Sequence, residues 1–84
     1  MLIPNPEYER ILAIAVEEAT DLTNTLRPDK DDDSGWDKFH DIHFGKVLTY
    51  IDEHTDLGYV EAADISEICQ EVENDIRHSD ILGL

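Results

Sequence analysis

Apolar residues recur at steps of three and four in three separate stretches of the chain, and this spacing constrains the fold more than any other feature. Such spacing places apolar side chains on one face of a helix. The first stretch predicts a helix from residue 6 to about residue 25, because Asn5 is a suitable N-cap and Pro6 suits the first helical position. Arg27 followed by Pro28 predicts its end. The apolar face of this helix comprises Tyr8, Ile11, Leu12, Ala15, Val16, Ala19 and Leu22.

The second stretch predicts a helix that begins near Trp36 or Asp37 and ends near His54. Gly45 lies inside it, and we expect this glycine to mark close packing against another helix. The predicted apolar face comprises Trp36, Phe39, His43, Val47, Tyr50 and Ile51, widened by Phe44 and Leu48.

The third stretch predicts a helix that opens with a capping box formed by Asp64 and Glu67 and ends near His78. Its apolar face comprises Ile65, Ile68, Cys69, Val72 and Ile76. Residues 55–63, before this helix, are compatible with a turn, a short extended piece or the start of another helix. After it, Ile81, Leu82 and Leu84 form a short apolar tail that either folds back on the core or contacts a partner.

Three amphipathic helices joined by polar segments predict an all-α fold, a small bundle of three helices. Residues 28–35 contain no apolar side chain apart from Pro28, and they predict an acidic loop between the first and second helices. With 84 residues the chain is long enough for one core only, so we expect a single acidic helical domain over residues 1–84.

The charge of the chain is far from balanced, with 21 acidic residues against 6 lysines and arginines and a formal net charge of -15. Self-repulsion on this scale destabilises a compact state. It also disfavours direct binding to nucleic acid or to anionic membranes, whose phosphates carry the same sign. A basic protein surface is the natural counterpart of such a chain, although adaptation to high salt is an alternative source of an acidic composition.

The sequence contains no feature that predicts export or membrane insertion. Its single Cys69 cannot form an internal disulfide, and the N-terminal residues lack the basic start and apolar run of a signal peptide. We therefore expect a cytoplasmic protein, in the host cytoplasm if a phage encodes it.

Two groups of residues resemble metal ligands without the complete pattern. Counted from Asp29, the acidic loop has Ser34 at the sixth position and His40 at the twelfth, where a helical calcium loop requires glycine and a bidentate acid. We therefore predict a solvated loop, with weak divalent-cation binding as the alternative.

A histidine pair on the second helix is the other group. His40 and His43, with Asp37 and Asp41 nearby, have the three- and four-residue spacing of helical zinc ligands. His43 falls on the apolar face, and only the distant His54 or His78 could complete the site, so we predict neither a metal site nor a cofactor.

Catalytic patterns are also missing. Cys69 falls on the apolar face of the third helix with acidic neighbours, which predicts a core residue without an activated thiol. The sequence has no glycine-rich phosphate loop. We therefore expect a binding protein and not an enzyme.

The acidic residues themselves are the predicted binding site. The leading hypothesis is an inhibitor or regulator that acts as a nucleic-acid mimic and occupies the basic site of a DNA- or RNA-binding protein. Phages and mobile elements encode small inhibitors of restriction enzymes, CRISPR complexes or host factors that often have this size and charge. The chain shares no sequence motif with them. The predicted partner-binding residues are Asp31, Asp32, Asp33, Glu61, Asp64, Glu67, Glu71 and Asp75.

Two aromatic residues are candidate anchors at such an interface. Trp36 continues the apolar face of its helix, which favours a core position, whereas Tyr59 lies in the ambiguous segment. The alternatives to a nucleic-acid mimic are an immunity protein or antitoxin that neutralises a basic toxin, and a module that binds divalent metal ions. The sequence does not indicate an oligomeric state.

Overall fold

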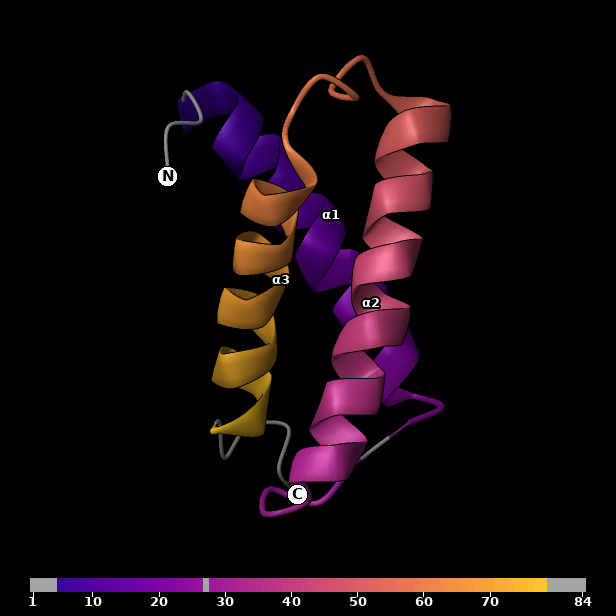
Figure 1. Ribbon diagram of the computed structural model, residues 1–84, viewed down its shortest axis with the longest axis vertical. Coiled ribbons are helices and arrows are strands. Elements are labelled where there is room, and N and C mark those ends of the chain that lie inside the picture. The colour runs from indigo at the N-terminus through magenta and orange to yellow at the C-terminus, as the bar shows by residue number, and fades with distance from the viewer. Residues whose placement is uncertain (1–4, 27, 79–84) are drawn as a thin grey trace.

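The computed structural model describes residues 5–26 and 28–78, which form three α-helices: α1 (Asn5–Thr23), α2 (Asp33–His54) and α3 (Ala62–Arg77). Figure 1 shows α2 and α3 side by side and running in opposite directions, with α1 crossing behind them. Each helix packs against the other two. The predicted all-α fold, a small bundle of three helices, is confirmed. Arg27 and the apolar tail at Ile81, Leu82 and Leu84 lie outside the described residues.

Helix α2 begins at Asp33, three residues before the predicted start. Asp32 is its N-cap, and the Asp32 carboxylate accepts a hydrogen bond of 3.0 Å from the backbone N–H of Gly35. Aspartate is one of the best residues at this position, and the helix dipole favours the charge of Asp33 in the first turn. The acidic loop is therefore shorter than expected, because Asp33, Ser34 and Gly35 belong to the helix.

Helix α3 also begins before its predicted start, and the expected capping box at Asp64 and Glu67 is wrong. Glu61 is the N-cap, its side chain makes no capping hydrogen bond, and its carbonyl accepts from the backbone N–H groups of Asp64 and Ile65 at 3.1 and 3.2 Å. Asp64 instead lies in the first turn, where the dipole favours a carboxylate. A capping pattern inside a helix is indistinguishable in sequence from one at its start.

The ambiguous segment before α3 is a turn. Thr55 caps α2, and its hydroxyl accepts a hydrogen bond of 3.1 Å from the backbone N–H of Leu57. The N–H of Val60 then donates to the Leu57 carbonyl at 3.0 Å. These bonds turn the chain while the Leu57 side chain is only 1% exposed, so the turn closes one end of the core.

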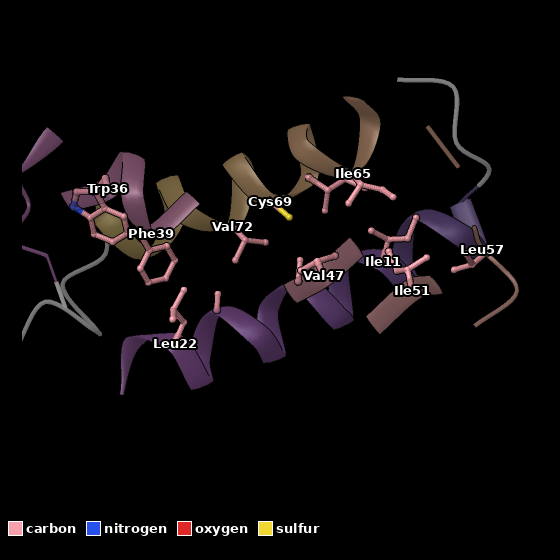
Figure 2. Close-up of a cluster of buried hydrophobic side chains, with 13 residues drawn as sticks. Ile11, Leu22, Trp36, Phe39, Val47, Ile51, Leu57, Ile65, Cys69 and Val72 are labelled. Atoms are coloured by element: carbon pink, nitrogen blue, oxygen red, sulfur yellow. The ribbon is translucent and has the colours of Figure 1, made fainter. Parts of the chain in front are cut away.

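The buried apolar side chains form one core that extends along the bundle. Figure 2 shows Trp36 and Phe39 near one end and Leu57 at the other. Full burial of a large aliphatic or aromatic side chain stabilises a fold by about 1.5–3 kcal/mol, so these contacts are the main force that holds the helices together. The core comprises Ile11, Ala15, Ala19, Leu22, Trp36, Phe39, Val47, Ile51, Leu57, Ile65, Ile68, Cys69 and Val72.

Three positions differ from the predicted packing. Val16 is 48% exposed and Tyr50 is 39% exposed, although both were expected on buried faces. Each follows a spacing of three or four residues, but this local spacing does not show which positions another helix covers. A Cβ atom at Gly45 would meet nothing within 4 Å, so this glycine does not mark close packing. In the part of the chain that the structure describes, no helix has the length and apolarity to cross a membrane.

Candidate functional site

The predicted partner-binding residues lie at the surface in two groups. The first group, the loop acids, comprises Asp31, Asp32 and Asp33 at the start of α2, and all three are exposed. The second group, the helix acids, is exposed except for the half-buried Asp64 and comprises Glu61, Asp64, Glu67, Glu71 and Asp75.

Two of the three loop acids make contacts that stabilise the fold. Arg77, in the last turn of α3, pairs with the Asp33 carboxylate at 2.5 Å and donates a hydrogen bond of 2.8 Å from Nε to the Lys30 carbonyl. The Arg77 guanidinium also lies 5.9 Å from the centre of the Trp36 ring. Since Asp32 caps α2 as well, only Asp31 of the three has no structural partner among the described residues.

The helix acids fall on one flank of α3. At about 100° per residue, the four acids inside α3 (Asp64, Glu67, Glu71 and Asp75) span less than a quarter of the helix circumference, and Glu61 is the N-cap before them. Glu71 accepts a hydrogen bond of 2.9 Å from the Tyr8 hydroxyl, so this flank borders α1. The same hydrogen bond is the largest cause of a raised Tyr8 pKa, and the charges of Glu71 and Glu67 add to it.

None of the helix acids forms an ion pair with a lysine or arginine within residues 5–26 and 28–78. The two arginine pairs of the described chain join Arg10 to Asp56 and Arg77 to Asp33. The flank of α3 therefore carries several carboxylates without an ion-pair partner among the described lysines and arginines.

The structure does not join the two acidic groups into one surface. Arg77 is turned about 200° around α3 from Asp75, which follows from the two-residue step between them. Because Arg77 contacts the loop acids while Glu71 contacts α1, the two groups lie on different sides of α3. The helix acids are thus the better candidate for a single docking surface.

The two candidate aromatic anchors differ in exposure. Trp36 is 8% exposed, and its indole N–H donates a hydrogen bond of 2.9 Å to the Asp29 carbonyl, so it belongs to the core. Tyr59 is 67% exposed, and its hydroxyl donates to the Glu7 carboxylate at 3.0 Å. This bond raises the pKa of Tyr59 and places its ring beside the first turn of α1, where Tyr8 contacts Glu71.

A cluster of polar side chains lies between the helices, and it joins the histidine pair noted in the sequence to Glu73, which the sequence did not single out. His40 and His43 on α2 both contact the Glu73 carboxylate on α3, with Nδ1 to oxygen distances of 2.8 and 2.7 Å. Nε2 of His43 lies 2.8 Å from the carbonyl oxygen of Ala15 on α1. Glu73 is 7% exposed and His43 is fully buried, so this cluster joins all three helices inside the core.

One part of this cluster has the order of a nucleophile, a base and an orienting carboxylate. The Ser66 hydroxyl lies 3.2 Å from Nε2 of His40, whose Nδ1 contacts Glu73. Acyl transfer also requires free N–H groups that stabilise an oxyanion. Ser66 lies inside α3, where neighbouring backbone N–H groups bond to the preceding turn, and Glu73 is shared with His43. We therefore interpret the arrangement as a structural network.

The candidate metal ligands are not arranged as a site. Both ring nitrogens of His43 are occupied by contacts within the core, and no group of three or more histidine, cysteine or acidic side chains in the described ranges could hold a metal ion. Cys69 is buried, and burial, together with the charge of Glu73, raises its pKa to about 12. Such a thiol is protonated at neutral pH and is a poor nucleophile.

Comparisons with protein-family models, with curated proteins and with solved structures find no match to this chain.

Proposed function

We propose that the protein is an inhibitor or regulator that mimics nucleic acid and occupies the basic site of a DNA-binding protein. The observation that carries the proposal is the uncompensated charge on a folded body. The described residues hold 20 of the 21 acidic residues and five of the six lysines and arginines, and so carry the full formal net charge of -15. Only two of these carboxylates pair with arginine.

The dimensions of the bundle support a duplex as the molecule that is mimicked. Its longest extent is 35 Å, which is close to the roughly 34–36 Å of one turn of DNA. Fifteen net charges over 35 Å correspond to about one charge per 2.3 Å. Double-stranded DNA carries about one per 1.7 Å and a single strand about one per 3.4 Å, so the chain lies nearer to the duplex value.

The helix acids supply the proposed docking surface. Four of them lie along α3 and Glu61 lies at its start, and none is neutralised by an ion pair with a lysine or arginine in the part of the chain that the structure describes. Tyr59, exposed beside α1, supplies an aromatic side chain at one end of this surface. Aromatic anchors surrounded by charges that steer association are common at protein interfaces.

The proposal is tested by removing charge from this surface alone. The test variant combines Glu67→Gln, Glu71→Gln and Asp75→Asn, and the introduced amide at 71 still accepts the hydrogen bond from Tyr8. The control variant removes three exposed charges elsewhere, with Glu17→Gln, Asp21→Asn and Glu53→Gln. Both variants change the net charge by the same amount.

The partner for this test is a protein captured from host lysate on the immobilised chain and released by duplex DNA. Association and dissociation rates are then measured for the wild type and both variants. We expect the test variant to associate at least tenfold more slowly, because charges at an interface act chiefly on the association rate. Equal rates for the two variants would show that the helix acids are not the docking surface.

A further inference from the structure

The cluster of His40, His43 and Glu73 has a property that is independent of the proposed function. His43 is fully buried, and each of its ring nitrogens faces an oxygen atom. Nε2 lies 2.8 Å from the carbonyl of Ala15, and Nδ1 lies 2.7 Å from the Glu73 carboxylate.

These two contacts fix the number of protons in the pair. A carbonyl oxygen can only accept, so Nε2 of His43 must carry a proton. A second proton must lie between Nδ1 and the carboxylate, because an ionised carboxylate also only accepts. This second proton sits on Nδ1 of an imidazolium or on Oε2 of a neutral Glu73. A neutral histidine beside an ionised glutamate would leave two lone pairs facing each other in one of the contacts.

His40 does not remove this requirement. Its Nδ1 lies 2.8 and 2.9 Å from the two carboxylate oxygens of Glu73 and its Nε2 lies 3.2 Å from the Ser66 hydroxyl, so the tautomer protonated at Nδ1 donates to Glu73 and accepts from Ser66. A neutral His40 therefore satisfies its own contacts and supplies no proton to His43.

We propose that the His43–Glu73 pair is a buried proton-binding site: folding captures one proton that the unfolded chain releases at neutral and alkaline pH. In the unfolded chain, histidine has a reference pKa of about 6.5 and glutamate of about 4.3, so above pH 7 the pair is mostly neutral imidazole and ionised carboxylate. The folded core holds one proton more. By linkage, the free energy of unfolding then falls as pH rises.

Other titratable groups near the pair set the range of the test. From α2 these are His40, Asp37 and Asp41, and from α3 they are Cys69 and Arg77, whereas α1 contributes the Ala15 carbonyl. Cys69, Tyr8 and Tyr59 lower stability only where they ionise in the unfolded chain, near pH 9 for the thiol and near pH 10 for the phenols, so they contribute little up to pH 8.5. Between pH 7 and pH 8.5 the pair is therefore the group to be measured.

The experiment measures chemical unfolding of the full chain between pH 7 and pH 8.5 at constant ionic strength, for the wild type, Glu73→Gln and His40→Ala. Uptake of one proton predicts a tenfold increase of the unfolding equilibrium constant per pH unit in the wild type. In Glu73→Gln the introduced amide donates to Nδ1 of a neutral His43, so the contacts no longer require the extra proton and the dependence disappears. His40→Ala keeps the pair and retains the dependence.

A flat wild-type profile over this range would overturn the proposal, and so would an equally steep profile in Glu73→Gln. If Glu73→Gln does not fold, proton uptake is measured directly on the wild type. Refolding heats at pH 8 are compared in two buffers of different ionisation enthalpy, and an uptake near one proton supports the site, whereas an uptake near zero refutes it.

Discussion

Arg77 and Arg10 offer a direct test of how position determines the value of an ion pair in a highly acidic chain. Each arginine pairs with one aspartate, and replacing either arginine by alanine changes the net charge of the chain by the same amount. The change in overall self-repulsion is therefore common to both variants. Any difference between Arg77→Ala and Arg10→Ala reports the local contacts.

The contacts of the two side chains differ greatly. Arg10 is 52% exposed and pairs with Asp56, which is 84% exposed, and such pairs contribute about 0.2–1 kcal/mol. Arg77 is 23% exposed and bonds to the Lys30 carbonyl, a charge-assisted hydrogen bond of about 1.5–3 kcal/mol. Its position over Trp36 adds about 0.5–1 kcal/mol.

We expect Arg77→Ala to lower the free energy of unfolding by about 2–4 kcal/mol and Arg10→Ala by less than about 1 kcal/mol. For a domain of this size, the difference corresponds to a gap of roughly 10 °C between the two melting temperatures. Urea unfolding followed by circular dichroism measures both variants in one buffer. Equal losses would refute the reasoning, because they would show that only the net charge matters.

Three further predictions concern salt, the buried thiol and two glycines. The melting temperature should rise between low and moderate neutral salt at pH 7, because ions screen the net charge of -15, and a flat curve in a salt series would contradict this. Native Cys69 should not react with a thiol-specific disulfide reagent at pH 8, since burial raises its pKa to about 12. Above pH 9 the unfolded thiol ionises and the folded one does not, so stability should fall with pH, and Cys69→Ala should remove this part of the fall. Gly45→Ala should stabilise α2 by about 1 kcal/mol, because a Cβ atom at residue 45 meets nothing within 4 Å. Gly35→Ala should destabilise α2, because a Cβ atom at residue 35 would collide with Asp32 and Pro28. Thermal melts of the two variants should therefore shift in opposite directions.

The existence of the helices could be predicted from sequence because apolar spacing is a local signal. The spacing that predicted α1, α2 and α3 also gave most of the core, including Phe39, Ile65 and Cys69. The starts of α2 and α3 were less accurate, because several acidic residues in each segment are suitable caps. Only the folded chain shows that Asp32 caps α2 and that Asp64 does not cap α3.

The arrangement of the acidic surface depends on tertiary packing, which the sequence does not reveal. Exposure of the helix acids follows from their position on α3. Their separation from the loop acids follows from Arg77, which lies against the start of α2.

Glu73 was missed for a similar reason. It resembles the surrounding surface acids in sequence, and its partners His40 and His43 are 33 and 30 residues away. Glu73 lies four residues after the buried Cys69, at the edge of the apolar face of α3, and this position was the sequence signal that its side chain is buried.

The central claim is that the chain takes the place of duplex DNA on a partner protein, and competition for that partner tests it most directly. A labelled duplex is bound to the captured partner at fixed salt, and the chain is added at increasing concentration. We expect the chain to displace the duplex completely, and its own affinity to fall steeply as salt rises. A partner that holds the chain and the duplex together at full affinity would contradict the account.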